Sequence, residues 1–205
     1  MGLKYYHSLQ KNIPRSEIQQ IEKYLVNKAK QIDPDLHILI CGSYRRGVQV
    51  SGDIDVMIFH VGIKYVRDIY KLAEQDSKSY LKLFVDLLSN EGFLIDNLSF
   101  NVMKYMGFCK FKSYPIRRID IRFMPYNSLP AAMLYFTGPQ QLNEEMRKRA
   151  KKRNMLLNEY GLFIVDSIGN RTLVPVHSEK DIFEEIGMIY LTPEEREQYN
   201  TGKFI

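Results

Sequence analysis

The sequence predicts an α+β fold, or more broadly a mixed α/β one, because helical and strand patterns are mixed along the chain. Apolar residues recur near the helical period over 16–30, which predicts a first helix with Ser16 as its candidate N-cap. Apolar runs over 36–40 and 54–60 predict two buried strands. Alternation of polar and apolar residues over 116–124 predicts a further strand with one buried face.

Two more segments between these strands have a clear pattern. Helical spacing over 65–91 predicts one helix, or two helices with a break near Asp76 and Ser77. The run over 103–111 predicts another strand. Together these elements predict a small mixed sheet flanked by helices.

Two prolines, Pro125 and Pro130, indicate a boundary between two parts of the chain. We expect a larger catalytic subdomain over 1–127 and a smaller α+β subdomain over 128–205. The sequence has no internal repeat and no low-complexity tract.

The composition is that of an ordinary globular protein, with 45% hydrophobic and 26% charged residues. No stretch approaches the roughly 20 apolar residues of a membrane span, and the N-terminus lacks the apolar core of a signal peptide. Cys41 and Cys109 are too few for a disulfide framework and are not spaced for zinc, so we expect buried thiols. These features favour an intracellular protein without a membrane partner.

The net charge of +5 suits a polyanionic partner, although many proteins of similar charge bind no nucleic acid. Its distribution is more informative, because six basic residues fall in one short segment: Arg147, Lys148, Arg149, Lys151, Lys152 and Arg153. A solvated helix face explains such a run as readily as a nucleic-acid surface does.

Two aspartates occupy an unusual place at the start of the second predicted strand. Side chains at i and i+2 of a strand share a face, so Asp53 and Asp55 should project together. Two like charges held close favour a cation, and oxygen ligands on a rigid strand suit Mg²⁺. Pairing with the alternating strand would bring Asp120 beside them. Three carboxylates predict a site for two ions and the chemistry of phosphoryl transfer.

The segment before these aspartates supports this interpretation. Gly42, Ser43 and Arg46 belong to a small turn that offers backbone amides, a hydroxyl and guanidinium groups, which together would bind a triphosphate. Ser51 and Gly52 form a second turn of this kind. From the dipeptide pattern alone an alternative stays open, because Asp-x-Asp also occurs at ordinary strand edges and turns.

Longer strings resemble a known family. Two strings in series are similar to the nucleotidyltransferase signature of the family X DNA polymerases, and most of all to that of DNA polymerase beta: Gly42-Ser43-Tyr44-Arg45-Arg46-Gly47 and Ser51-Gly52-Asp53-Ile54-Asp55-Val56. The segment around Asp120 resembles the strand with the third metal ligand, and Tyr135-Phe136-Thr137-Gly138 resembles the nucleotide-sugar segment. Matching intervals continue to Phe183, so the resemblance covers nearly the whole chain.

The resemblance implies a polymerase palm and a C-terminal subdomain that closes over the nascent base pair and contacts the template. It implies that Asp53, Asp55 and Asp120 are catalytic and bind two Mg²⁺ ions, for which Mn²⁺ can substitute. The nucleotide-binding residues that it implies are Gly42, Ser43, Arg46, Ser51, Gly52, Tyr135, Phe136, Gly138 and Asn143. The DNA-binding residues that it implies are Arg118, Arg147 and Lys148, with Arg118 also steering Asp120.

Some positions depart from the family pattern. Asn12 stands where relatives have an arginine directed at the triphosphate, and Gln140 and Glu144 replace an acidic and a basic residue. Phosphate affinity and fidelity therefore do not carry over. The family has an unusual cis peptide at the position of Gly138-Pro139, and proline lowers the cost of that geometry to about 1 kcal/mol. We expect a cis bond there.

The leading hypothesis is template-directed addition of dNTPs to a primer 3′ hydroxyl, as in gap filling during DNA repair. The expected partners are primer–template or gapped DNA and a dNTP. We expect the protein to be a monomer. It would act in the nucleus if it is eukaryotic, and in the host cytoplasm or the virion if it is viral. Two alternatives are a template-independent nucleotidyltransferase and a weakly active DNA-binding fragment of a larger repair polymerase.

The family's lyase and helix-hairpin-helix units, which precede the matching region in relatives, have no counterpart in this sequence. We expect either a piece of a larger protein or a natural minimal viral polymerase.

Overall fold

The computed structural model describes residues 5, 9, 12–75 and 79–200. The chain divides into two compact units, with 1–44 and 48–126 in unit 1 and with 45–47 and 127–205 in unit 2. The short segment 45–47 thus belongs with the C-terminal part of the chain, which the sequence did not indicate. The predicted break at Asp76 and Ser77 lies outside the described residues, and our functional division at residue 127 stays a prediction.

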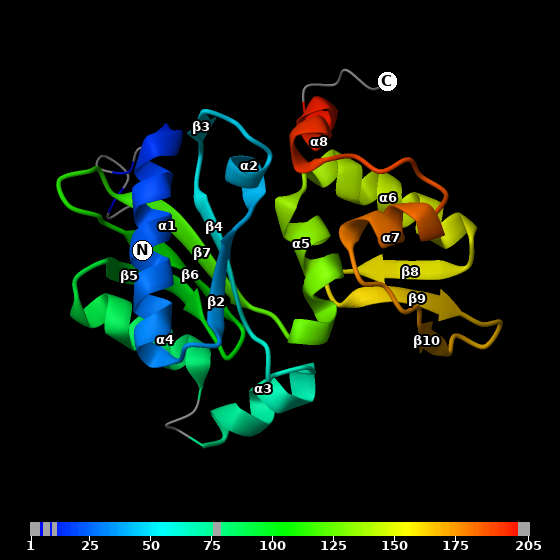
Figure 1. Ribbon diagram of the computed structural model, residues 1–205, viewed down its shortest axis with the longest axis horizontal. Helices are drawn as coiled ribbons and strands as arrows, with labels where there is room; N and C mark the ends of the chain where they lie inside the picture. The colour runs from blue at the N-terminus through cyan, green and yellow to red at the C-terminus, as the bar shows by residue number, and fades with distance from the viewer. Residues whose placement is uncertain (1–4, 6–8, 10–11, 76–78, 201–205) are drawn as a thin grey trace. The chain divides into compact units, whose positions relative to one another are not determined.

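Unit 1 is built on a five-stranded mixed sheet in the order β2-β4-β7-β6-β5 (Figure 1). β4 and β7 run parallel, whereas the other neighbouring strands are antiparallel. A separate antiparallel pair joins β1 to β3. The strands are β1 (Ile13–Pro14), β2 (Leu36–Ile40), β3 (Val50–Ser51), β4 (Ile54–His60), β5 (Leu94–Phe100), β6 (Lys104–Cys109) and β7 (Arg117–Phe123).

Helices α1 (Arg15–Ile32) and α4 (Tyr80–Asn90) bury their apolar faces in the same core as the sheet of unit 1. Alternate residues of β4 and β7, such as Ile54 and Ile119, point into this core. The residues between them point to the other face of the sheet. Two shorter helices, α2 (Gly42–Arg45) and α3 (Val66–Ala73), lie in the connections around β4.

A buried ion pair joins α1 to β7. Arg117 donates from Nε and Nη2 to the two carboxylate oxygens of Glu17, each at 2.7 Å. Both side chains are almost fully buried, so each charge depends on the other for its neutralisation. The pair therefore fixes how α1 lies on the sheet that bears Asp120.

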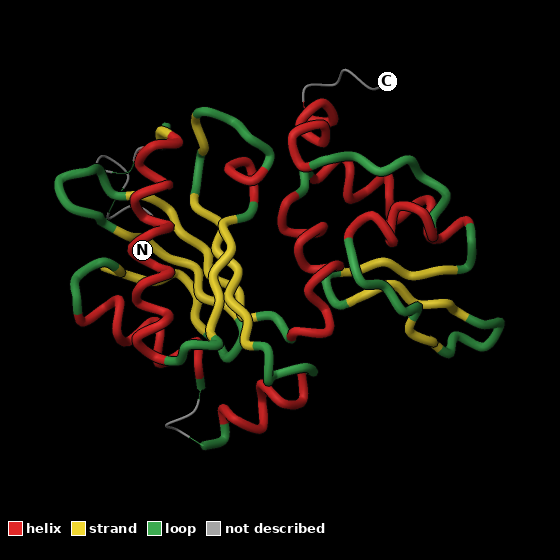
Figure 2. Tube along the Cα trace, in the orientation of Figure 1, coloured by secondary structure: helices red, strands yellow, loops and turns green. Residues whose placement is uncertain are grey.

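Unit 2 combines helices with a three-stranded antiparallel sheet, whose strands have the order β10-β9-β8 (Figure 2). Its apolar core includes Leu142, Leu162 and Phe183, from a helix, a strand and a second helix. A 3₁₀ turn (Tyr126–Ser128) precedes the first helix. The elements are α5 (Leu129–Thr137), α6 (Gln140–Lys152), β8 (Met155–Asn158), β9 (Gly161–Val165), β10 (Arg171–Leu173), α7 (Glu179–Glu185) and α8 (Pro193–Asn200).

The mixed α+β class is confirmed, and the predicted strands over 36–40 and 54–60 match β2 and β4. The segment over 65–91 forms two helices, α3 and α4. The prediction of Ser16 as an N-cap is wrong, because the helix begins at Arg15 and its N-cap residue is Pro14. Pro14 suits the position since its ring fixes φ near the observed −60°.

Two further expectations concern single features. Cys41 and Cys109 are both buried thiols outside any disulfide, as predicted. The peptide bond between Gly138 and Pro139 is cis, which confirms the prediction made at that position. Within the described residues, no helix has both the length and the apolar character that crossing a membrane would require.

Candidate active site

Asp55 and Asp120 are direct neighbours on two central strands of unit 1. β4 and β7 pair in parallel, and their register places Asp55 opposite Asp120. Both side chains lie on the face away from the helical core, because the flanking Ile54 and Ile119 are buried in that core. Neighbouring strands are about 4.8 Å apart, so two carboxylates stand side by side. Their like charges favour a cation bound to both.

Asp53 lies two residues before Asp55, at an exposed position just ahead of β4. Among the described residues, the ligand oxygens of Asp53, Asp55 and Asp120 do not all lie within 4.8 Å of one another. Like-charged carboxylates repel each other unless a cation draws them together. The parallel pairing brings two of the predicted ligands together, and convergence of all three stays a prediction.

Gly42 closes one side of the Asp55 carboxylate. Its backbone has a φ of +59°, and a Cβ at this residue would lie 2.2 Å from Oδ2 of Asp55. The amide of the preceding residue, Cys41, donates to the backbone carbonyl of Asp55 at 2.8 Å. Only glycine fits here, because any side chain would occupy the space of the carboxylate. The predicted nucleotide-binding turn and the predicted metal ligand are therefore in direct contact.

Arg118 holds the carboxylate of Asp120. Its Nη2 donates to Oδ1 of Asp120 at 2.9 Å, and its Nη1 donates to the carbonyl of Gly107 on β6. The guanidinium also lies over the ring of Phe108, 5.5 Å from the ring centroid. An arginine anchored at three points orients Asp120 and leaves the Oδ2 atom of Asp120 for another partner. The position agrees with the predicted steering role and does not test the predicted DNA contact.

The two serines of the predicted triphosphate turns contact each other. Oγ of Ser43 donates to Oγ of Ser51 at 2.8 Å, and Ser51 is buried in the β1–β3 pair. Gly52, which follows, is exposed and has no atom within 4 Å of the position of a Cβ. Its backbone can therefore be approached closely, which is the property that phosphate-binding turns require.

Arg15 supports the same turn, and the sequence interpretation missed it. Its Nη1 donates to the carbonyl of Tyr44 at 2.7 Å, and its guanidinium lies 4.1 Å from the centroid of the Tyr44 ring. Asn12 is exposed, and its carbonyl accepts a long bond of 3.4 Å from Arg117. The only signal for Arg15 in the sequence was its place three residues after Asn12, the position that departs from the family pattern.

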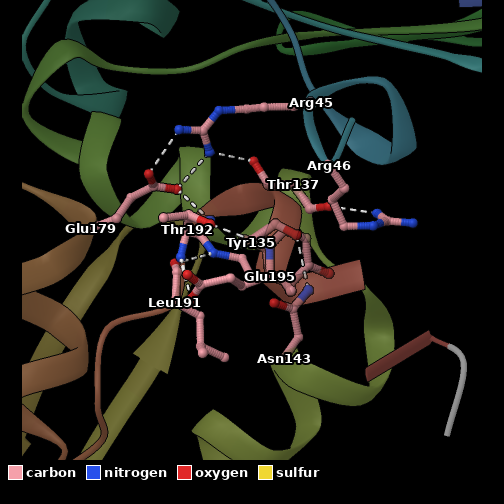
Figure 3. Close-up of polar contacts among 10 residues, drawn as sticks. Arg45, Arg46, Tyr135, Thr137, Asn143, Glu179, Leu191, Thr192 and Glu195 are labelled. Atoms are coloured by element: carbon pink, nitrogen blue, oxygen red, sulfur yellow. Dashed lines mark hydrogen bonds and ion pairs between the residues drawn. The ribbon is translucent and has the colours of Figure 1, made fainter. Parts of the chain in front are cut away.

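Within unit 2, two consecutive arginines are bound to the end of α5 (Figure 3). Nη1 of Arg45 donates to Oγ1 of Thr137 at 2.7 Å, and Nη1 of Arg46 donates to the carbonyl of the same residue at 2.6 Å. Arg45 also forms a bidentate ion pair with Glu179, in which Nη1 and Nη2 donate to Oε1 and Oε2 at 2.7 and 2.8 Å. Glu179 in turn accepts from the fully buried Arg196 at 2.9 Å.

This cluster was not predicted from the sequence, because Glu179 and Arg196 lie far along the chain from the arginine pair. Burial by itself would raise the pKa of the Glu179 carboxyl. Hydrogen bonds and charges from Arg45 and Arg196 outweigh that effect and lower the pKa below 4.5. The carboxylate therefore stays ionised and holds Arg45 in place.

Three predicted residues gather around a fourth, Tyr135, in unit 2. The rings of Tyr135 and Phe136 meet edge to face at 4.9 Å, and Nδ2 of Asn143 donates to the carbonyl of Tyr135 at 2.9 Å. The guanidinium of Arg147 lies over the Tyr135 ring at 5.1 Å. Tyr135, Asn143 and Arg147 also line one small cavity. The structure thus brings these residues together on α5 and α6, next to the cis bond after Gly138.

Comparison with protein families assigns both parts of the chain. Residues 12–126 match the family described as DNA polymerase beta palm, and residues 132–197 match the one described as DNA polymerase beta thumb. The chain belongs to family X of the DNA polymerases. The resemblance stated from the sequence is therefore confirmed, and unit 1 contains the family X palm.

Several curated proteins are similar to this family X chain over nearly all of its length. DNA polymerase lambda of Rattus norvegicus is 33% identical over 96% of the chain and 35% of that protein. DNA polymerase lambda of Arabidopsis thaliana is 30% identical over 96% of the chain and 38% of that protein. DNA nucleotidylexotransferase of Gallus gallus is 26% identical over 95% of the chain and 42% of that protein. The chain spans between 35% and 42% of the length of these relatives.

A basic groove in unit 2 of this family X chain lies between α6, β8 and the β9–β10 turn. It measures about 640 Å³, and three of its lining residues are cationic: Arg147, Lys151 and Arg171. Its one carboxylate, Asp166, accepts from the backbone amides of Ile168 and Asn170 at 3.0 and 2.8 Å. Among the described residues, none of the three cations forms an ion pair with a carboxylate. Lys148, also a predicted DNA contact, is exposed on α6.

A different group of ligand-type side chains lies at the far end of β4 in unit 1. Ligand atoms of Asp33, Asp35 and His60 all lie within 4.8 Å of one another. Nδ1 of His60 accepts from the amide of Gly62 at 2.9 Å, so its proton lies on Nε2, which donates to Asp33 at 3.0 Å. This leaves no free lone pair on the imidazole, and we interpret the group as a hydrogen-bond network.

Proposed function

We propose that this chain is the catalytic part of a template-directed DNA polymerase that fills gaps during DNA repair. The reaction adds a dNTP to a primer 3′ hydroxyl and releases pyrophosphate. The observation on which the proposal rests is the register of β4 and β7, which sets Asp55 beside Asp120 next to a glycine turn in a family X palm. Because the chain spans less than half of its relatives, their full activities are not carried over.

The residues at this place fit divalent cations. All three predicted ligands are carboxylates, the hard oxygen donors that Mg²⁺ and Mn²⁺ prefer. Gly42 has no Cβ to collide with Oδ2 of Asp55, so the carboxylate can keep its place opposite Asp120. Asp53, Asp55 and Asp120 would hold two Mg²⁺ ions. The ions would activate the attacking hydroxyl and stabilise charge on the leaving pyrophosphate.

The side chains have separate roles in this proposal. Asp120, oriented by Arg118, faces the primer 3′ hydroxyl with its second oxygen. Ser43, Arg46 and the amide of Gly52 bind the triphosphate. Tyr135 and Phe136 pack against the sugar and disfavour a 2′ hydroxyl. Asn143 and Arg147 reach the minor-groove side of the new base pair.

Primer extension on gapped DNA tests the proposal. Asp120→Ala should reduce the rate by roughly 10²–10⁴-fold, since it removes a metal ligand and the carboxylate that faces the primer 3′ hydroxyl. Nucleotide binding should persist, because Arg46 and the glycine turn remain. Extension by Asp53→Ala or Asp55→Ala at the rate of the parent would contradict the metal assignment. Gapped-DNA binding without extension by the parent would instead favour a DNA-binding fragment.

A second candidate function is nucleotidyl transfer without a template. One similar protein is named DNA nucleotidylexotransferase, and it matches 95% of this chain. The grouping of Asn143 and Arg147 around Tyr135 favours template reading, because these side chains can face a base pair. Extension of single-stranded DNA with one dNTP at a time separates the two functions. Template-directed activity predicts incorporation of the complementary base in a gap and none on a single strand.

The cellular setting follows from the activity proposed. A eukaryotic enzyme that repairs DNA would act in the nucleus, and localisation of the tagged chain tests this. The monomeric state stays a prediction, which sedimentation velocity with and without gapped DNA can check.

A further inference from the structure

Two consecutive residues of α8 hold the arginine pair at 45–46 in position, one by direct contact and one through Glu179. Arg196, fully buried, donates to Glu179, and Glu179 holds Arg45. Glu197, the next residue, accepts a hydrogen bond from Nε of Arg46 in an ion pair. The helix near the C-terminus of the described chain thus reaches both arginines of the predicted triphosphate turn, and all five residues belong to unit 2.

The guanidinium of Arg46 is held at two of its three nitrogens. Nε binds Glu197, and Nη1 donates to the carbonyl of Thr137 at 2.6 Å. Because the group is planar, two bonds fix its plane and its direction. The side chain is only 10% exposed. Within the part of the chain that the structure describes, Nη2 has no hydrogen-bond acceptor, so this nitrogen is left to donate elsewhere.

Glu197 is itself held in position. Its second oxygen accepts from Nδ2 of Asn200 at 3.0 Å, one turn further along α8. The buried Arg196 beside it anchors the helix, with Nε donating to the carbonyl of Leu191 at 3.0 Å. Because the Glu197 carboxylate is fixed in this way, it can determine the orientation of the Arg46 guanidinium. An arginine that is already oriented loses less rotamer freedom when it binds an anion.

We propose that Glu197 is a positioning residue that directs Nη2 of Arg46 toward a phosphate oxygen of the incoming nucleoside triphosphate. The inference rests on the proposed function, in which Arg46 binds the triphosphate. Glu197 binds Nε and leaves the terminal Nη2 for phosphate, so its main effect is on direction. If its negative charge instead competed with phosphate, removing it would tighten nucleotide binding, and the two effects have opposite signs.

Steady-state single-nucleotide extension on gapped DNA measures that sign. Glu197→Ala should raise the KM for the dNTP roughly tenfold, which is typical of losing one charge-assisted contact, with kcat changed by less than about twofold. Glu197→Gln should recover much of the loss, because the amide oxygen still accepts from Nε. Glu185→Ala removes the same charge from an exposed place on α7 and should match the parent. An unchanged or lower KM in Glu197→Ala overturns the proposal.

A double-mutant cycle shows whether the effect passes through Arg46. In an Arg46→Ala background, Glu197→Ala should cause no further rise in KM, because the group that it orients is gone. A further rise would mean a general structural role and would overturn the proposal. Thermal unfolding of each variant identifies any loss of fold, in which case Glu197→Gln provides the comparison.

Calorimetric titration of dTTP with Mg²⁺, without DNA, separates this inference from the polymerase function. Weaker dTTP binding by Glu197→Ala than by the parent supports positioning even if neither protein extends a primer, and then only the polymerase proposal fails. If the parent binds no dTTP, both proposals fail. If both proteins bind dTTP equally and the KM values agree, the positioning role is refuted while the polymerase function stands.

Discussion

Gly42 shows how one residue can connect the predicted nucleotide turn to the predicted metal site. Its φ of +59° is unfavourable for any other residue, and an added Cβ would lie 2.2 Å from Oδ2 of Asp55. We expect Gly42→Ala to reduce the rate of primer extension at least tenfold, because the Asp55 carboxylate would have to move away from the added Cβ. The backbone strain should cost about 1–2 kcal/mol of unfolding free energy. Chemical denaturation and gapped-DNA extension measure the two effects separately.

Gly92 supplies the matched control for Gly42. It also has a left-handed backbone, with a φ of +78°, but a Cβ there would meet no atom within 4 Å. Gly92→Ala should therefore show a similar loss of stability from strain and an unchanged rate of extension. Equal rates for Gly42→Ala and Gly92→Ala would show that the contact with Asp55 has no functional role.

At the scale of elements, one buried carboxylate joins α7 and α8 to the arginine segment 45–47. Glu179 is bound by Arg45 and Arg196, and its side chain is only 8% exposed. Replacing it with glutamine removes the negative charge that pairs with the fully buried Arg196 and the partly buried Arg45. We expect Glu179→Gln to lower the free energy of unfolding by about 3 kcal/mol at neutral pH.

The stability that Glu179 provides should depend on pH. Although burial raises its pKa, hydrogen bonds and charges from Arg45 and Arg196 lower the net pKa below 4.5. A carboxyl with a depressed folded pKa stabilises above its unfolded pKa, and that stability is lost as pH falls through the folded value. The gap between the parent and Glu179→Gln should therefore narrow below a pH of about 4.3. Unfolding curves that keep a constant gap down to acid pH would contradict this assignment.

The elements that sequence patterns predicted well are those with a strong apolar signal. The strands β2 and β4 are continuous apolar runs in the core, and their bounds were predicted without error. β5 (Leu94–Phe100) was missed because it is an edge strand in which only Leu94 is buried, so its residues do not alternate by burial. The N-cap of α1 was also missed, since the pattern showed where apolar residues recur and not which backbone groups need a cap.

At the scale of the whole molecule, the candidate site was predictable where its residues are close in sequence or share a strand pattern. Asp53 and Asp55 were found by their spacing, and Asp120 by alternation in a strand that does pair with β4. The support of the site came from residues distant in sequence. Glu179, Arg196 and Glu197 reach the arginine pair only because unit 2 folds around it, and no local spacing predicts such contacts.

The affinity of the molecule for DNA, and its dependence on salt, should reflect where its positive charges lie. The groove of unit 2 presents Arg147, Lys151 and Arg171 without carboxylate partners among the described residues. If nucleic-acid phosphates lie there, Lys151→Gln combined with Arg171→Gln should reduce the slope of log K against log salt by about 1.4–1.8. Affinity at low salt should fall with it, because fewer counterions are released.

A control pair of basic residues, both lysines, tests whether net charge alone explains that result. Lys64 and Lys71 are exposed in unit 1, and replacing both with glutamine removes the same charge from the molecule. Fluorescence anisotropy with labelled gapped DNA, over a series of salt concentrations, should give this control a slope near that of the parent. If the slope of log K against log salt falls equally in both double variants, DNA is attracted by overall charge and the groove is not a specific binding site. A reduced slope in the groove variant alone places about two phosphates beside α6 and the β9–β10 turn.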